Sequence, residues 1–136
     1  MKQSAIKAAK SIWNSLPLII GTILLISLVS TIIPKHLILL IFKNNFILDP
    51  LIGSFFGSIF AGNPIVSYLF AGELLNQGIS LIAVTAFIVS WVTVGIIQIP
   101  AESAILGKKF TLLRNLSAFI FAIIVAIITI LILTII

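Results

Sequence analysis

Long apolar stretches, interrupted by a few charged or proline-containing segments, dominate the pattern along this chain. Residues 17–33, 79–99 and 116–136 contain no charged side chain. The hydrocarbon core of a bilayer is about 30 Å thick and a helix rises about 1.5 Å per residue, so segments of this length are close to those that cross a membrane. The pattern predicts an all-α, polytopic membrane protein with about three spanning helices.

The residues before the first predicted span place apolar and basic side chains at helical spacing. Ile6 and Trp13 fall on one face of a helix, while Lys7 and Lys10 point elsewhere. This arrangement is typical of a helix that lies on a membrane with its tryptophan at the headgroup level. We therefore predict an interfacial amphipathic helix over residues 1–16.

The segment 37–48 is apolar only as far as Phe42, which makes it too short to cross a bilayer. Extending a span through it would bury Lys43 and Asp49, at roughly 2.5–3.5 kcal/mol each. We therefore predict that this segment lies at the membrane interface. A basic loop is predicted over residues 100–115, between the last two spans.

Two short segments in the middle of the chain share one starting signal. Asp49-Pro50 and Asn63-Pro64 each combine a side chain suited to a helix N-cap with a proline suited to the first helical position. A helix of about twelve residues rises only about 18 Å, so neither segment crosses alone. They predict a broken helix within residues 51–77, either a re-entrant hairpin or one kinked span. Its two parts are residues 51–62 and 64–77.

The distribution of positive charge favours the hairpin. The N-terminal segment carries three lysines, and the 100–115 connection carries three basic residues against Glu102. Positive loops prefer the cytoplasm, and a hairpin that enters and leaves by one face keeps both connections there. Lys35 and Lys43 add charge to the opposite face, so insertion in both orientations stays open. The prediction is a multi-pass protein of the cell membrane with a cytoplasmic N-terminus.

A helix break inside a membrane has to be surrounded by protein or water, because lipid offers no hydrogen-bond partners for backbone N–H and C=O groups. Free N–H groups and the positive dipole end of the segment 64–77 would point toward the membrane interior. Discontinuous helices of this kind build substrate sites in transporters, whereas a plain kink would be filled by neighbouring helices. Both interpretations stay open. Candidate residues for a solute pathway are Gly62, Asn63, Pro64, Ser67, Tyr68, Glu73, Ser90 and Thr93.

Small residues recur on one face of the first half-helix. Side chains of this size let another backbone approach closely, so the face is predicted to serve helix packing. Its members are Gly53, Ser54, Gly57, Ser58 and Ala61.

The amino-acid composition narrows the classes of function that fit this chain. Hydrophobic residues make up 61% of the chain and charged residues 8%, and the mean hydropathy is +1.37. The net charge of +5 sits beside apolar segments, where anionic lipid headgroups rather than nucleic acid are the natural partners. With one histidine, no cysteine and no paired carboxylates, the sequence predicts no enzyme, no metal site and no cofactor.

Residues 61–115 begin AGNPIVSYLFAGELLNQGIS and resemble a family of predicted permeases that includes the organoarsenical efflux permeases. The segment 76–88, NQGISLIAVTAFI, is similar to a stretch that follows a proline-containing turn in that family. Full-length relatives carry two such units and have cysteines near the turn, whereas this chain has one unit and no cysteine. The absence of cysteine argues against arsenic as the solute.

The resemblance implies a permease subunit for a small solute, with a homodimer or higher homo-oligomer standing in for the two-unit protein. Three spans plus a hairpin would place two fused units in inverted orientation, and an antiparallel dimer would do the same. The alternative is a non-transporting accessory or assembly protein, in which the broken helix and the small-residue face serve packing alone.

Overall fold

The computed structural model describes residues 2–32, 35–60 and 62–136, and it is all-helical, with no strand in these ranges. Two compact units, residues 1–34 and 35–136, make up the chain. The helices are α1 (Lys2–Ile32), α2 (Lys35–Ile41), α3 (Leu48–Ile59), α4 (Pro64–Asn76), α5 (Leu81–Thr93), α6 (Ile99–Leu106) and α7 (Lys108–Ile135).

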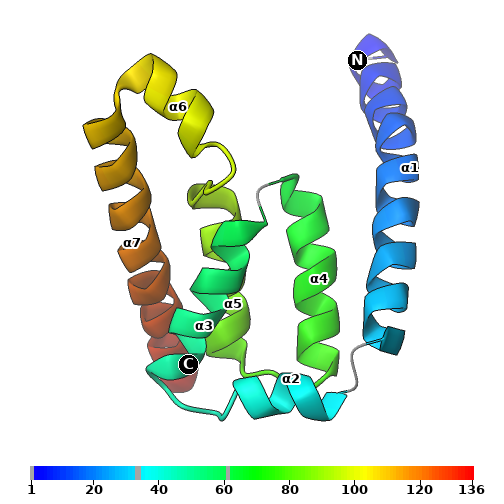
Figure 1. The fold of residues 1–136 in the computed structure, drawn as a ribbon. Coiled ribbons are helices and arrows are strands. Elements are labelled where there is room, and N and C mark those ends of the chain that lie inside the picture. Colours follow the sequence, from blue (N-terminus) through cyan, green and yellow to red (C-terminus); the bar gives the residue numbers. More distant parts are fainter. Residues whose placement is uncertain (1, 33–34, 61) are drawn as a thin grey trace. The chain divides into compact units, whose positions relative to one another are not determined.

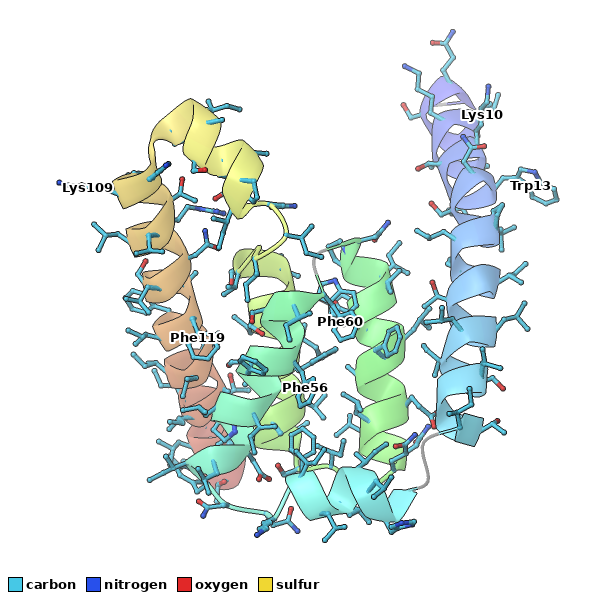
Figure 2. All side chains as sticks on the ribbon, viewed as in Figure 1. Lys10, Trp13, Phe56, Phe60, Lys109 and Phe119 are labelled. Carbon is cyan, nitrogen blue, oxygen red and sulfur yellow. The ribbon has the colours of Figure 1, made fainter. Side chains whose placement is uncertain are left out.

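The first unit consists of α1, which runs without interruption through Pro17. One continuous helix replaces the two elements expected over residues 1–16 and 17–33. Proline removes one N–H from the helical ladder and its ring crowds the carbonyl of the preceding turn, a change that membrane-spanning helices tolerate. The stretch Ile6–Leu28 is long and apolar enough to cross a membrane. Lys10 and Trp13 project from its N-terminal half (Figure 2). Ile33 and Pro34, the expected end of the span, lie outside the described residues.

The second unit is organised around α5, which packs against α3, α4 and α7 (Figure 1). Helices α3 and α5 run parallel, since Gly53 lies against Ala83 and Gly57 lies against Phe87. Helix α7 runs antiparallel to α5, because Ala126 near its end packs with Ile82 near the start of α5. Four residues, 77–80, connect α4 to α5 and reverse the chain direction.

Helices α3 and α4 are separate elements that run in opposite directions on either side of residues 60–63, which we call the helix break. The chain therefore turns back between them, so that α3 and α4 form an antiparallel pair (Figure 1). As expected, Asn63 is the N-cap of α4 and Pro64 is its first residue. The start of α3 differs from expectation: the helix begins at Leu48, so Asp49 lies within its first turn and does not act as the N-cap.

Two helical stretches are long and apolar enough to cross a membrane among the described residues, one in α1 and the other in α7. The span expected over residues 79–99 is shorter, because α5 has 13 residues and rises about 20 Å. Its helix ends before Gly95, and a turn precedes α6. The expected loop over residues 100–115 is itself helical, with Gly107 at φ +87° separating α6 from α7.

Helix α2 lies across the turn between α4 and α5. Ile38 and Phe42 pack on a buried cluster that includes Ala71, Ile79 and Val84. Gly78, with φ +93°, allows the chain to leave α4 at this point, one residue after the end of the predicted segment 64–77. The predicted interfacial segment 37–48 thus forms a short helix that closes this end of the unit.

Candidate functional site

The side-chain and carbonyl oxygens of Asn63 accept hydrogen bonds from the N–H groups in the first turn of α4. The Ile65 N–H donates to the Asn63 side-chain oxygen at 2.9 Å, and the N–H groups of Val66 and Ser67 donate to the Asn63 carbonyl at 3.0 and 3.4 Å. Pro64 has no N–H to offer. The free N–H groups expected at this helix terminus are therefore already bonded, and an anion would have to displace the cap to reach them.

Aromatic rings fill the inner side of the helix break. Phe60 stacks on Trp91 with ring centroids 5.4 Å apart and an interplanar angle of 13°, and Phe70 lies 5.9 Å from Trp91. Phe87 completes this aromatic cluster at 5.3 Å from Trp91. A side chain at Gly62 would start 3.8 Å from the Trp91 indole nitrogen. The break therefore rests on aromatic surface and not on polar side chains.

The helix break lies near one end of the second unit. Trp91 is one helical turn before Gly95, and the Gly95 N–H donates to the Asn115 side-chain oxygen at 3.0 Å. Asn115 immediately precedes the uncharged part of α7. Consequently the break lies at the same end of the second unit as the turn after α5 and the Asn115 side chain.

Comparisons with known proteins leave the family open. No protein-family model, curated protein or solved structure matches this chain. The resemblance of residues 61–115 to predicted permeases therefore stays a prediction from sequence.

Of the predicted pathway residues, four gather at the break: Gly62, Asn63, Pro64 and Ser67. The first three are exposed, while Ser67 is buried and its hydroxyl donates to the Pro64 carbonyl at 2.7 Å. The Ser67 hydroxyl thereby stabilises the first turn of α4. These four residues are the members of the predicted pathway that lie at the break.

The remaining predicted pathway residues lie elsewhere. Tyr68 is exposed on α4. Glu73 is near the far end of α4, about 15 Å along the helix from Asn63, and accepts a hydrogen bond from the Gln77 side chain at 2.9 Å. On α5, Ser90 is buried against Gly57, and Thr93 is exposed with its hydroxyl bonded to the Val89 carbonyl at 2.7 Å. The Ser90 hydroxyl also bonds within α5, to the Phe87 carbonyl at 3.2 Å.

The small-residue face of α3 lies directly on α5. A Cβ atom at Gly53 would overlap the Ala83 carbonyl oxygen and lie 3.0 Å from its carbon. At Gly57 it would overlap both the Ser90 hydroxyl and the Phe87 carbonyl oxygen. Ser54 and Ser58 are buried on the same helix, and Ala61 lies outside the described residues. The glycines thus allow the two backbones to touch.

Sequence reasoning missed the contact between Asp49 and Ser80. The Ser80 hydroxyl donates to Asp49 Oδ2 at 2.6 Å, and Asp49 is fully buried. Its Oδ1 is buried without a hydrogen-bond partner. The contact joins the first turn of α3 to the N-cap of α5, where both helix dipoles favour a carboxyl group. A helix-start signal in the sequence marks Asp49 but not Ser80, and the pairing of the two depends on tertiary structure.

Sequence reasoning also missed Asn115, which is the centre of a polar cluster at the other end of the bundle. Its side-chain amide accepts from Gly95 N–H and donates to the Thr111 carbonyl at 3.0 Å and to Glu102 at 3.3 Å. Glu102 also pairs with Arg114. The amide thereby connects the turn after α5 to α6 and α7.

Replacing Asn115 by alanine is expected to lower the free energy of unfolding by about 2–3 kcal/mol, because the buried Gly95 N–H would lose its acceptor. The measurement is an SDS-induced unfolding titration of the purified protein in detergent. Asn76→Ala, at an exposed position on α4, is the matched control and is expected to change little. Equal stability of the two variants would contradict a structural role for the Asn115 amide.

Proposed function

We propose that this protein is a membrane permease subunit that moves a small solute past the helix break, assembled as a homo-oligomer. Its surface supports membrane insertion. Helix α7 exposes large apolar side chains along its length, including Phe121 at 62% and Leu133 at 55%. Exposed apolar area of this extent is unusual for a soluble monomer and natural in lipid.

One observation carries the proposal. Two short antiparallel helices, α3 and α4, meet at non-helical backbone beside the buried side chains of Ser67 and Trp91. Helices of 12 and 13 residues rise about 18 and 20 Å, so the hairpin reaches only part of the way across a bilayer core. Non-helical backbone at such a place is stable when protein or water surrounds it. Transporters build substrate sites in this way.

The size of the second unit supports the proposed homo-oligomer. Residues 35–136 use the small face of α3 and most of α5 to pack against each other, so the buried surfaces are already occupied within the subunit. A path that is enclosed on all sides needs further helices. A second copy of the chain would supply them and would match the two-unit organisation that the sequence resemblance implies.

Replacing Asn63 by alanine tests the proposal. The variant frees the Ile65 N–H and loses a cap that stabilises a helix by about 1 kcal/mol, so the break is expected to change shape and solute flux to fall several-fold. The measurement is light scattering by vesicles that contain the protein, in gradients of glycerol, urea, glycine and sodium methanesulfonate. Asn76→Ala, at the other end of α4, is expected to keep the flux of the unmodified protein.

The accessory-protein alternative is favoured by a different observation. The N–H groups at the start of α4 are bonded to Asn63, and the aromatic cluster packs the break. A protein of this type would form oligomers, and its vesicles would pass no solute faster than protein-free vesicles. That result for the unmodified chain would reject the permease proposal and retain the alternative.

A further inference from the structure

The indole of Trp91 holds a hydrogen-bond donor for which the described residues offer no acceptor. Trp91 is only 6% exposed, and its Nε1 is buried without an acceptor. An indole N–H only donates, and tryptophans that are buried generally find a partner for it. A buried donor without an acceptor lowers stability, so its presence beside the helix break requires a reason.

The two oxygen atoms of Asn63 and the hydroxyl of Ser67, at the start of α4, are already bonded. The Asn63 side chain and carbonyl accept from the first turn of α4, and the Ser67 hydroxyl donates to Pro64. Among the described side chains at the break, the Trp91 N–H is therefore the buried donor that is available to a ligand. Its distance of 3.8 Å from the Cβ position at Gly62 places it directly under the break.

Phe60 covers the face of the Trp91 ring. The two rings are nearly parallel, with an interplanar angle of 13° and centroids 5.4 Å apart. Phe60 is 48% exposed and follows the last residue of α3 in an extended conformation, so its ring can swing away without breaking a helical turn. Figure 2 shows it at the end of α3, toward α4. A flat side chain thus occupies the place that a flat ligand would take.

Positive charge lies at this end of the unit on one element, the start of α7. Lys108, Lys109 and Arg114 lie in the first two turns of α7, and Asn115 bonds to Gly95, one turn beyond Trp91. Figure 2 shows the Lys109 side chain extending away from the start of α7. Glu102 neutralises Arg114, while both lysines remain to attract an anion. The charge distribution therefore favours a negatively charged ligand.

We propose that Trp91 binds a small planar anion, which displaces Phe60, stacks on the indole and accepts a hydrogen bond from its N–H. The inference rests on the proposed permease function, for which it names the class of solute. Phe60 is then an internal competitor that covers the site when no solute is bound. Removing it is expected to strengthen binding, whereas removal of a purely structural side chain would not.

Benzenesulfonate is a suitable probe because it is planar, permanently anionic and rich in oxygen acceptors. In Trp13→Phe protein, Trp91 is the remaining tryptophan and reports binding by its fluorescence. Benzenesulfonate is expected to change this emission and to bind at least about tenfold more tightly than methanesulfonate, which lacks the ring, or benzyltrimethylammonium, which lacks the acceptor. An unchanged emission, or equal binding of the three probes, would overturn the inference.

Two variants test the geometry by equilibrium dialysis with labelled benzenesulfonate. Phe60→Ala is expected to tighten binding by about threefold or more, and Trp91→Phe, which keeps a ring but loses the N–H, to weaken it by about tenfold. Phe55→Ala, at an exposed ring on the same helix, is the control and should bind as the unmodified protein does. If Phe60→Ala does not fold, Phe60→Leu replaces it. Unchanged or weaker binding by the Phe60 variant that folds rejects the competition.

Flux separates this inference from the proposed function. Benzenesulfonate that binds at Trp91 while no solute enters the vesicles would support the binding site and reject the permease. Vesicles that pass other solutes while benzenesulfonate neither binds nor enters would support the permease and reject the planar anion as its solute class.

Discussion

Replacing Gly57 by alanine is expected to lower the free energy of unfolding by about 3 kcal/mol. The added methyl group would overlap the Phe87 carbonyl oxygen and the Ser90 hydroxyl. A backbone carbonyl in the middle of a helix moves only with the whole helix, so α3 would have to separate from α5. Gly53→Ala meets the Ala83 carbonyl in the same way and is expected to have a similar effect.

Gly72→Ala is the matched control, because it makes the same change within α4, where a new Cβ atom would find no atom within 4 Å. Alanine forms helices better than glycine, so this variant is expected to be as stable as the unmodified protein or more stable by up to about 1 kcal/mol. SDS-induced unfolding in detergent measures all three variants. A Gly57→Ala protein as stable as Gly72→Ala would show that α3 does not pack on α5 as described.

Adding a Ser90→Ala substitution refines the result. The double variant removes one of the two obstacles at Gly57 and keeps the Phe87 carbonyl. It is expected to recover only part of the lost stability. Complete recovery would show that the side chain of Ser90, and not the backbone of α5, sets the separation of the two helices.

Signals that act over a few residues were enough to predict the helix break. Asn63 and Pro64 define the start of α4 through one side-chain oxygen and one missing N–H, and both effects are local. The stop at Gly78 is local for the same reason, since it depends on a positive φ. The position of the break could thus be anticipated without knowledge of the rest of the fold, whereas these local signals left a hairpin and a kinked span both open.

Features that depend on distant residues could not be predicted in the same way. The apolar run over residues 79–99 has the composition of a span, but composition does not show that α5 ends at Thr93, before Gly95 contributes its N–H to Asn115 on α7. The stacking of Phe60 on Trp91 joins residues 31 positions apart. The hydrophobicity of Phe60 and Trp91 identifies both side chains as apolar, but it does not predict that they are in contact. The candidate binding group at the break was therefore visible only in three dimensions.

Asp49 and Ser80 provide the second test, because they join two helix starts that the sequence presents as separate. Replacing Asp49 by alanine is expected to destabilise the protein by about 3 kcal/mol, through the loss of a buried hydrogen bond and of a favourable group at two helix N-termini. Ser80→Ala removes only the hydrogen-bond donor and leaves the buried carboxyl without a partner, so a loss of about 2 kcal/mol is expected.

A double-mutant cycle distinguishes a direct contact from two independent effects. If the Ser80 hydroxyl bonds to the Asp49 carboxyl, the two substitutions share one interaction, and their combined cost should fall short of the sum by about 1.5 kcal/mol or more. Asp49→Ala combined with Thr85→Val is the control, because the Thr85 hydroxyl bonds to the Leu81 carbonyl within its own helix. That pair should be additive. Additivity in the Asp49 and Ser80 pair as well would mean that α3 and α5 are not joined at their N-termini. The parallel arrangement that positions Trp91 under the helix break would then lose this contact and keep those of Gly53 and Gly57 with α5.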